Sequence, residues 1–213
     1  MIRRLRLLLP ACLPLLAACA LLGGGGKPGS ITIYSPLPTG NPGGAKLAAL
    51  PAMDWQLGIA KPSAARMIDS PRIAVRPLPH ELQVYRGATW SMPATDLLET
   101  AVLGVLEDSG KLAGVARLTS GLHSDYRLVM DVRRFEADYA GQAVPTATIE
   151  VSAKLLHSQS QKVVASELFL ARQPAAGTAL DAVVPAFAQA LEQLSVRIAH
   201  WAMASGQADR NQP

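Results

Sequence analysis

Residues 146–172 read TATIEVSAKLLHSQSQKVVASELFLAR, and their pattern indicates a β-sheet. In its first part, every second residue from Ile149 to Leu155 is apolar and the residues between them are polar. That two-residue period is typical of a β-strand with one buried face. A polar segment from Ser158 to Gln161 then separates two strand-like runs and predicts a turn. We therefore expect an antiparallel hairpin.

The same period, or a short run of β-branched and aromatic residues, predicts the remaining strands. In the longest of them, alternate residues from Tyr126 to Val132 are apolar. Proline and glycine punctuate the connections, and Arg86-Gly87 is expected to form a turn. The expected strands cover residues 31–34, 55–59, 72–76, 82–85, 114–118, 125–139, 146–157 and 162–172.

A first helix is predicted over residues 95–109, where apolar residues recur at spacings of three and four. Thr95 or Asp96 is expected to cap its start, because short polar side chains accept hydrogen bonds from the first free N–H groups. Gly110 is expected to end it, since glycine readily takes the left-handed conformation that closes a helix.

A second, longer helix is predicted near the end of the chain. Seven apolar residues recur between Leu180 and Trp201 at alternating spacings of four and three, and Gly206 follows them. Such a stripe fits a helix packed on a sheet and also fits a coiled coil; packing on a sheet is the simpler interpretation. The polar residues from Gln207 to Pro213 are expected to be a disordered tail.

These elements predict the α+β class: a single domain in which two α-helices cover one face of a largely antiparallel β-sheet. We expect four parts along the chain. They are a lipoprotein signal peptide at residues 1–18, an acylated cysteine with a glycine-rich tether at 19–30, the folded domain at 31–205, and the tail at 206–213.

Composition excludes several classes of protein. The 213 residues are 49% hydrophobic and 17% charged, which is too apolar for a disordered chain. The net charge is +4, but Arg3, Arg4 and Arg6 lie in the expected signal peptide, so about +1 would remain after its removal. The other basic residues are scattered among acidic ones. We therefore do not expect nucleic acid as a partner.

The N-terminus has the features of an export signal. Three arginines precede an apolar stretch of about ten residues, which is too short to span a bilayer, and small residues follow. Leu16-Ala17-Ala18-Cys19 resembles the bacterial lipobox, in which the cysteine is acylated and becomes the first residue of the mature protein. Cys12, the only other cysteine, lies in the segment to be removed, so Cys19 is the predicted lipidation site.

Acylation of Cys19 would anchor the domain at a membrane, since two or more acyl chains bind stably. We expect the domain on the periplasmic side of the cell envelope. Ala20 follows the cysteine, whereas an aspartate there signals retention in the inner membrane in lipoproteins of the enterobacterial type. Its absence favours the outer membrane.

Candidates for catalysis or for metal and nucleotide binding are weak. Ser120, His123 and Asp125 lie within six residues, but such proximity is more typical of a loop than of a triad. His80-Glu81 begins like a zinc-protease motif, yet Val84 stands where the second histidine belongs. Gly26-Lys27 lacks the surroundings of a phosphate-binding loop. We expect no catalytic residues, no metal site and no cofactor.

Four aromatic residues have two interpretations. Trp55 and Tyr34 lie on early predicted strands, and Tyr85 and Trp90 flank a turn-rich segment before the first helix. Such side chains can line a contact surface for lipid or protein. Packing in the core is the more common role and is the one we expect.

Several landmarks occur in a characteristic order along residues 31–205. They are Ile33-Tyr34 soon after the lipobox, Asp69-Ser70-Pro71-Arg72-Ile73-Ala74-Val75-Arg76-Pro77, Tyr85-Arg86-Gly87-Ala88-Thr89-Trp90 before Leu97-Leu98, Tyr126-Arg127-Leu128 with Phe135, and Ala186-Phe187 with Trp201. The chain thereby resembles the ABC-type transport auxiliary lipoproteins, the PqiC-like group associated with MCE-type lipid transport. The family's usual leucine soon after the first tyrosine is displaced here to Leu37.

The resemblance implies a non-enzymatic component of a transport system for phospholipid or another hydrophobic molecule. Its partners would be an MCE-domain substrate-binding protein, a permease and an ATPase. A ring-shaped homo-oligomer is associated with the group. Two alternatives stay open: a lipoprotein that itself binds a hydrophobic ligand, and a periplasmic hydrolase acting through Ser120.

Replacing the predicted acylation site tests the anchor. Cys19→Ser removes the thiol that accepts the lipid, so we expect an unlipidated protein that leaves the membrane fraction. Cys12→Ser is the matched control and should be lipidated normally, because Cys12 would be removed with the signal peptide. Intact mass and membrane fractionation measure both. A Cys19→Ser protein that still carries lipid contradicts the prediction.

Overall fold

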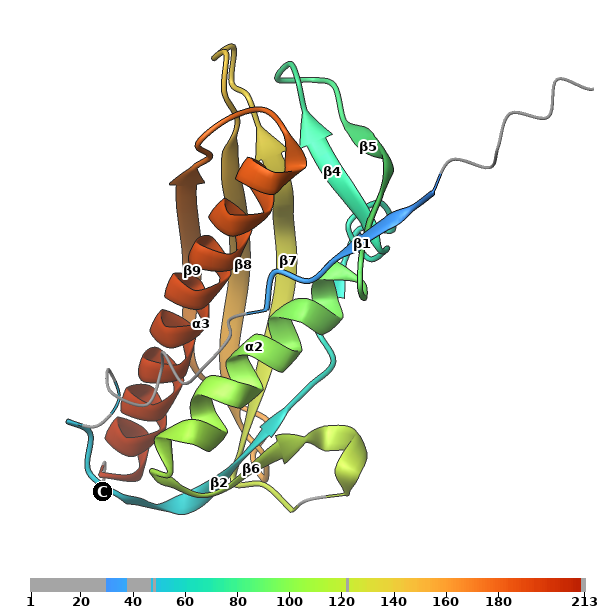
Figure 1. Cartoon of the computed structure of the whole chain (residues 1–213). Coiled ribbons are helices and arrows are strands. Elements are labelled where there is room, and N and C mark those ends of the chain that lie inside the picture. Colours follow the sequence, from blue (N-terminus) through green and yellow to red (C-terminus); the bar gives the residue numbers. More distant parts are fainter. Residues whose placement is uncertain (1–29, 38–46, 48, 122, 212–213) are drawn as a thin grey trace, which may run out of the picture. The chain divides into compact units, whose positions relative to one another are not determined.

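In the described part of the chain, nine strands form one mixed sheet, and the helices α2 and α3 lie against one of its faces (Figure 1). The computed structural model describes residues 30–37, 47, 49–121 and 123–211. The strands are β1 (Thr32–Tyr34), β2 (Met53–Ile59), β3 (Ser63–Ala64), β4 (Arg72–Arg76), β5 (Gln83–Trp90), β6 (Leu112–Arg117), β7 (Tyr126–Asp138), β8 (Thr146–His157) and β9 (Val163–Pro174). The helices are α2 (Ala94–Ser109) and α3 (Leu180–Arg210), with a short 3-10 helix, η1 (Leu118–Ser120).

Strand β7 organises the sheet. Along one edge it pairs in antiparallel fashion with β8 over its whole length, and β8 pairs with β9 in the predicted hairpin. Along its other edge lie three short strands, β2, β3 and β4, each parallel to it. The α+β class, with two helices covering one face, is confirmed. The longest ladders are antiparallel as expected, and the shorter parallel pairings make the sheet mixed.

A β-bulge between Val132 and Arg134 changes which residues of β7 face the helices. Before it, the buried side chains are the predicted even-numbered ones, ending at Val132. After it, Phe135 and Ala137 are buried instead. The single extra residue in β7 reverses the alternation. The bulge thus places Phe135 in the core, where a regular strand would have placed its neighbours.

The first helix begins differently from the prediction. Pro93 precedes it, and no side chain caps its N-terminus. Thr95 lies inside the helix, where its hydroxyl donates a hydrogen bond to the Asp69 carboxylate at 2.6 Å. The predicted cap at Thr95 or Asp96 is therefore wrong. The predicted end is confirmed, since Gly110 has φ +60° and closes the helix.

The turn predicted at Arg86-Gly87 is also absent among the described strands, because β5 continues from Gln83 to Trp90. Gly87 has φ +66°, a conformation that glycine adopts without strain. The strand can therefore carry an irregularity at this point and still reach Trp90. The register between β4 and β5 shifts in the same region.

Helix α3 extends to Arg210, beyond its predicted end at Gly206. Residues 206–210, predicted to belong to the tail, are therefore helical. Gly206 is buried in the helix because it packs against Trp55. A Cβ at position 206 would lie 2.8 Å from two atoms of the Trp55 ring. Here glycine serves close packing rather than helix termination.

Aromatic rings fill the layer between the helices and the sheet. Trp90, Phe135 and Phe187 form one cluster, with ring centroids 5.1 to 6.0 Å apart. Trp55 and Tyr126 form a second cluster, with centroids 5.0 Å apart in an edge-to-face arrangement. All five side chains are at most 2% exposed. The clusters join α3 to β2, β5 and β7, which are distant in sequence.

Two helical glycines give a matched test of this packing. Gly206→Ala should lower the free energy of unfolding by about 1–3 kcal/mol, because its methyl group would overlap the Trp55 ring. Gly104→Ala should raise it by about 0.5–1 kcal/mol, because nothing lies within 4 Å of its Cβ and alanine favours a helix. Urea denaturation measures both. Equal effects of the two substitutions would contradict the close contact.

Candidate functional site

The segment from Ser120 to Asp125 does not form a catalytic triad. The Ser120 hydroxyl donates to the Arg117 carbonyl at 2.8 Å. The Asp125 carboxylate accepts the Gln56 N–H at 2.8 Å and pairs with Arg210 at 3.8 Å. Among the residues that the structure describes, no histidine forms a hydrogen bond or ion pair with that carboxylate. It therefore does not orient His123 as a general base.

The remaining candidates for metal chemistry are dispersed. His80 is exposed, and Glu81 accepts a hydrogen bond from the Gln83 amide. Among the described residues, no group of three or more histidine, cysteine, aspartate or glutamate side chains could hold a metal ion. Gly26-Lys27 lies outside those residues.

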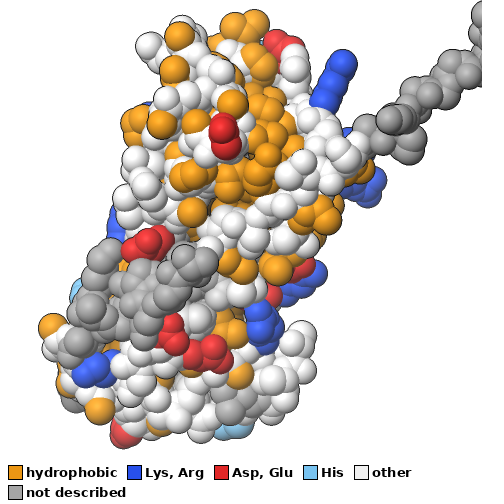
Figure 2. All heavy atoms as spheres, viewed as in Figure 1, with side chains coloured by type: hydrophobic (Ala, Val, Ile, Leu, Met, Phe, Trp, Pro, Cys, Tyr) orange, Lys and Arg blue, Asp and Glu red, His pale blue; other side chains and the backbone are white. Residues whose placement is uncertain are grey.

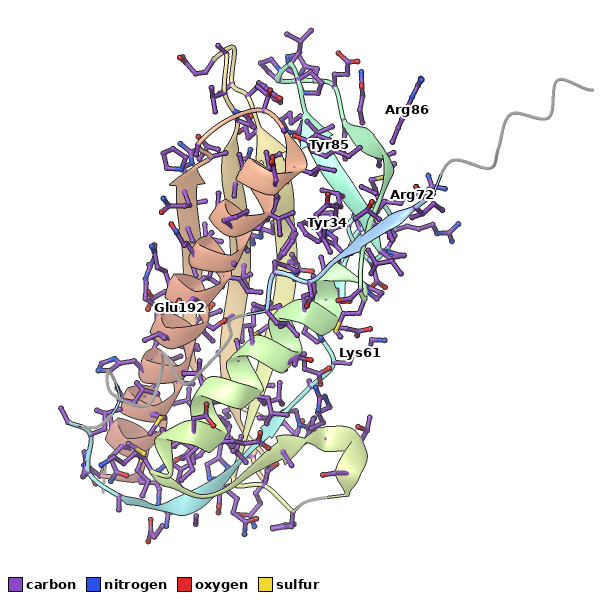
Figure 3. The ribbon with its side chains drawn as sticks, in the orientation of Figure 1. Tyr34, Lys61, Arg72, Tyr85, Arg86 and Glu192 are labelled. Atoms are coloured by element: carbon purple, nitrogen blue, oxygen red, sulfur yellow. The ribbon has the colours of Figure 1, made fainter. Side chains whose placement is uncertain are left out.

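The four aromatic residues divide into two pairs. Trp55 and Trp90 are buried and belong to the core, as predicted. Tyr34 and Tyr85 are half-buried on β1 and β5, and Figure 3 shows them in the region between these strands and the first turns of α3. This second pair packs against the core on one side and is accessible to solvent on the other.

Hydrophobic side chains gather on the surface over β1, β5 and the N-terminal turns of α3 (Figure 2). Arg72 and Arg86 are exposed beside it and project into solvent (Figure 3). Exposed apolar patches on soluble domains often mark contact sites. We define the apolar surface by half-buried apolar side chains of β1, β5 and the first turns of α3, namely Tyr34, Tyr85, Ala88, Leu180 and Val184.

The Tyr85 hydroxyl is unusual within the apolar surface. Its oxygen is buried and makes no hydrogen bond of ordinary length and angle in the described part of the chain, although the Tyr139 hydroxyl interacts with it weakly. Burial raises the pKa of Tyr85, with the neighbouring Tyr139 as a smaller cause. A buried hydroxyl without a partner costs free energy. The sequence predicts an aromatic residue near this strand, but no pattern in it indicates the surroundings of the hydroxyl.

The Tyr126 hydroxyl provides a contrast. It donates a hydrogen bond of 2.8 Å to the Asp209 carboxylate near the end of α3. Burial is the main cause that raises the pKa of Tyr126, and the bond to Asp209 raises it further. This bond joins the start of β7 to the last turn of the helix. Its role is therefore structural.

Charged residues on the other face of the sheet also join elements. Glu136 is 2% exposed, and its carboxylate accepts bonds of 2.8 and 3.0 Å from Arg76 and 2.7 Å from Arg134. Arg134 also bonds Asp138 at 2.5 Å. The hydrogen bond to Glu136 raises the pKa of Arg76. This network holds β4 against β7, and no motif in the sequence pointed to it.

The predicted lipidation site, Cys19, lies outside the described residues. Within them, no helix has the length and hydropathy needed to cross a membrane.

Comparisons with known proteins agree on a family. The sequence model of the ABC-type transport auxiliary lipoprotein component matches residues 36–199. A crystal structure of a protein from Xanthomonas campestris is 52% identical, with a TM-score of 0.76 over 85% of this chain and all of that one.

More distant structures share less with the chain. A solved structure of an uncharacterized protein is 17% identical, with a TM-score of 0.59 over 81% of this chain and 98% of that one, and it supports the fold alone. The PelC dodecamer from Paraburkholderia phytofirmans is 10% identical, with a TM-score of 0.44 over 70% of this chain and 89% of that one. Among curated proteins, no match to the chain is found.

The two tyrosines allow the same chemical change to be compared at two sites. Tyr126→Phe should lower the free energy of unfolding by about 1–2 kcal/mol, because it removes the bond to Asp209. Tyr85→Phe should leave it unchanged or raise it by up to about 1 kcal/mol, because it removes an unpaired buried hydroxyl. Urea denaturation at pH 7 measures both. If Tyr85→Phe lowers the free energy of unfolding more than Tyr126→Phe does, the hydroxyl of Tyr126 is not the better bonded of the two.

Proposed function

The chain belongs to the ABC-type transport auxiliary lipoprotein family, and we propose that it is a non-enzymatic, lipid-anchored component of a transporter for phospholipid or another hydrophobic molecule. The observation that carries the proposal is the family match over residues 36–199, with a lipobox ending at Cys19 ahead of it. Its partners would be an MCE-domain substrate-binding protein, a permease and an ATPase.

The proposed mechanism is mechanical. Acylated Cys19 holds the protein at a membrane, and the glycine-rich segment at residues 20–30 sets its reach, at most about 38 Å when extended. The folded domain then presents a contact surface to the transporter. Ala20 after the cysteine supports the outer membrane as the site of anchoring.

We propose that a protein component of the transporter binds to the apolar surface. It combines half-buried tyrosines with exposed arginines at its side, a composition typical of protein interfaces. The arginines beside it suit a protein partner, whose carboxylate and carbonyl oxygens accept hydrogen bonds, better than a purely hydrocarbon ligand, which accepts none.

The alternative is a lipoprotein that itself holds a hydrophobic ligand inside the domain. Fully buried side chains, among them Trp55, Trp90 and Phe187, occupy the layer between the helices and the sheet. A ligand in that layer would have to displace them. This packing favours the role of a transporter component over that of a ligand carrier.

Co-purification from membranes, read by mass spectrometry, tests the proposal. We expect transporter components to accompany the wild-type protein and to be lost, at least about tenfold, from Leu180→Arg, which places a charge in the apolar surface. Leu168→Arg is the matched control, since Leu168 is 51% exposed on β9, and it should retain them. A desolvated charge in an interface costs far more than one facing solvent.

Two results would overturn the proposal. One is wild-type protein that yields no transporter component. The other is wild-type protein that yields only stoichiometric bound lipid, which would favour the ligand-carrying alternative. Thermal unfolding of both variants establishes that each is folded.

A further inference from the structure

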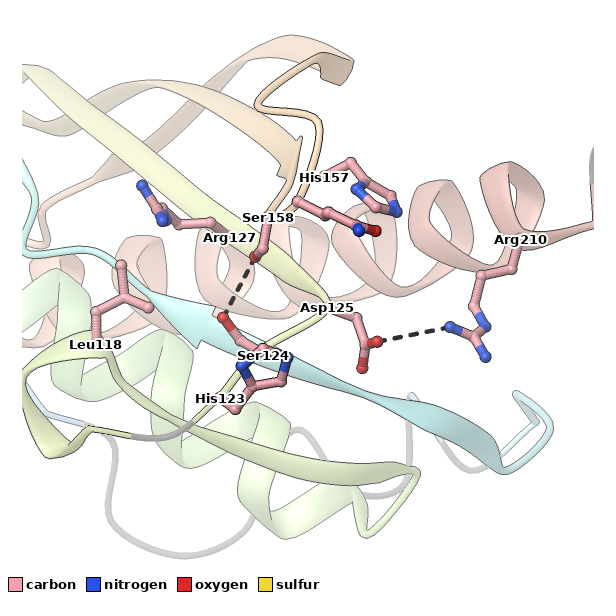
Figure 4. Close-up of a pocket in the computed structure, with 9 residues that line it drawn as sticks. Leu118, His123, Ser124, Asp125, Arg127, His157, Ser158 and Arg210 are labelled. Atoms are coloured by element: carbon pink, nitrogen blue, oxygen red, sulfur yellow. Dashed lines mark hydrogen bonds and ion pairs between the residues drawn. The ribbon is translucent and has the colours of Figure 1, made fainter.

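A polar cleft of about 700 Å³ lies at the end of the sheet where β7 begins and the β8–β9 hairpin turns (Figure 4). The hydroxyls of Ser124 and Ser158 meet inside it, with their oxygens 3.4 Å apart. Arg127 lies to one side of them, and the Asp125–Arg210 ion pair lies to the other. His157 also contributes to the lining.

The backbone holds the walls of the cleft in place. The Ser158 N–H donates to the Asp125 carbonyl at 2.8 Å, which fixes the hairpin to the start of β7. On β2, Gly58 is buried beneath the loop that carries Ser124. A Cβ at position 58 would overlap Leu118 and lie 2.8 Å from Ser124 Oγ. A glycine is therefore needed for the loop to sit where it does.

The charges of the cleft are not balanced. The only acid in its lining, Asp125, is satisfied by the Gln56 N–H and by Arg210, which also pairs with Asp54 at 3.3 Å. Arg127 has no hydrogen-bond or ion-pair partner among the described residues, and its Nε is buried. The other arginines of β7, Arg133 and Arg134, both pair with acids. An unpaired, partly buried guanidinium is costly unless a ligand supplies the anion.

We propose that this cleft binds a phosphate group. Guanidinium presents a planar fork of donors that suits oxyanions, and the two serine hydroxyls offer further donors in the same cleft. The oxygens of a phosphate group are arranged tetrahedrally, so they can meet donors that do not lie in one plane, whereas the two oxygens of a carboxylate lie in one plane with its carbon. The group can belong to free phosphate or to the headgroup of a phospholipid. The site is separate from the apolar surface and does not depend on the proposed transport role.

Calorimetric titration of the full-length, lipidated protein in phosphate-free detergent tests the site. The probes are inorganic phosphate, glycerophosphoglycerol as a soluble lipid headgroup, and acetate, all at one ionic strength. We expect a phosphate-bearing probe to bind and acetate to bind at least tenfold more weakly. Tighter binding of glycerophosphoglycerol identifies a lipid headgroup as the source, and tighter binding of inorganic phosphate identifies the free ion.

Variants assign the binding to the cleft. Arg127→Gln should weaken binding about tenfold or more, because it removes the charged donor. Arg133→Gln is the matched control on the same strand; it is 50% exposed and already paired, so binding should not change. Ser158→Ala is a smaller change and should also weaken phosphate binding. It provides the test if the Arg127→Gln protein does not fold.

The proposal is overturned if neither phosphate probe binds, if acetate binds as tightly as phosphate, or if Arg127→Gln and Ser158→Ala bind as the wild type does. The two experiments are independent. A wild-type protein that co-purifies with no transporter component can still bind phosphate, and a protein that binds no phosphate can still belong to the transporter.

Discussion

The structure depends on the pairing of β7 along both of its edges. Thirteen residues make this strand about 44 Å long. One edge is satisfied by a single partner, β8, whereas the other is divided among β2, β3 and β4. Because buried N–H and C=O groups must be paired, these three short segments, separated by turns, are each held in place by the same long strand. Residues from the first half of the domain are thereby fixed against the second half.

The bulge in β7 divides that strand into two regions with different tasks. On the N-terminal side, the outward-facing Arg127 is left unpaired and contributes to the polar cleft. On the C-terminal side, the outward-facing Glu136 is buried beneath Arg76 and Arg134. Removing one partner from a buried ionic network of this kind is strongly destabilising. We therefore regard the charges beyond the bulge as structural and the charge before it as available for binding.

Much of the fold could be predicted from periodicity, because one-sided burial imposes a period on strands and helices. The hairpin of β8 and β9, the start of β7 and both helices were predicted in this way. Features that depend on tertiary contacts could not be predicted from periodicity. Gly206 looked like a helix end but is a contact with Trp55, and Thr95 looked like a cap but bonds Asp69. The two-residue strand β3 carries no periodic signal at all.

The site was harder to predict than the fold, for a related reason. Ser120 and His123 lie close to Asp125 in the sequence, yet the residue whose hydroxyl meets that of Ser158 is Ser124. The cleft combines the start of β7, the β8–β9 turn and the end of α3, which no local motif links. Arg127 is a charged residue within a long strand, but Arg133 and Arg134 share that property, so the sequence alone does not single it out. Only the folded sheet reveals that the acids near this arginine already have partners, so the guanidinium remains free for an anion.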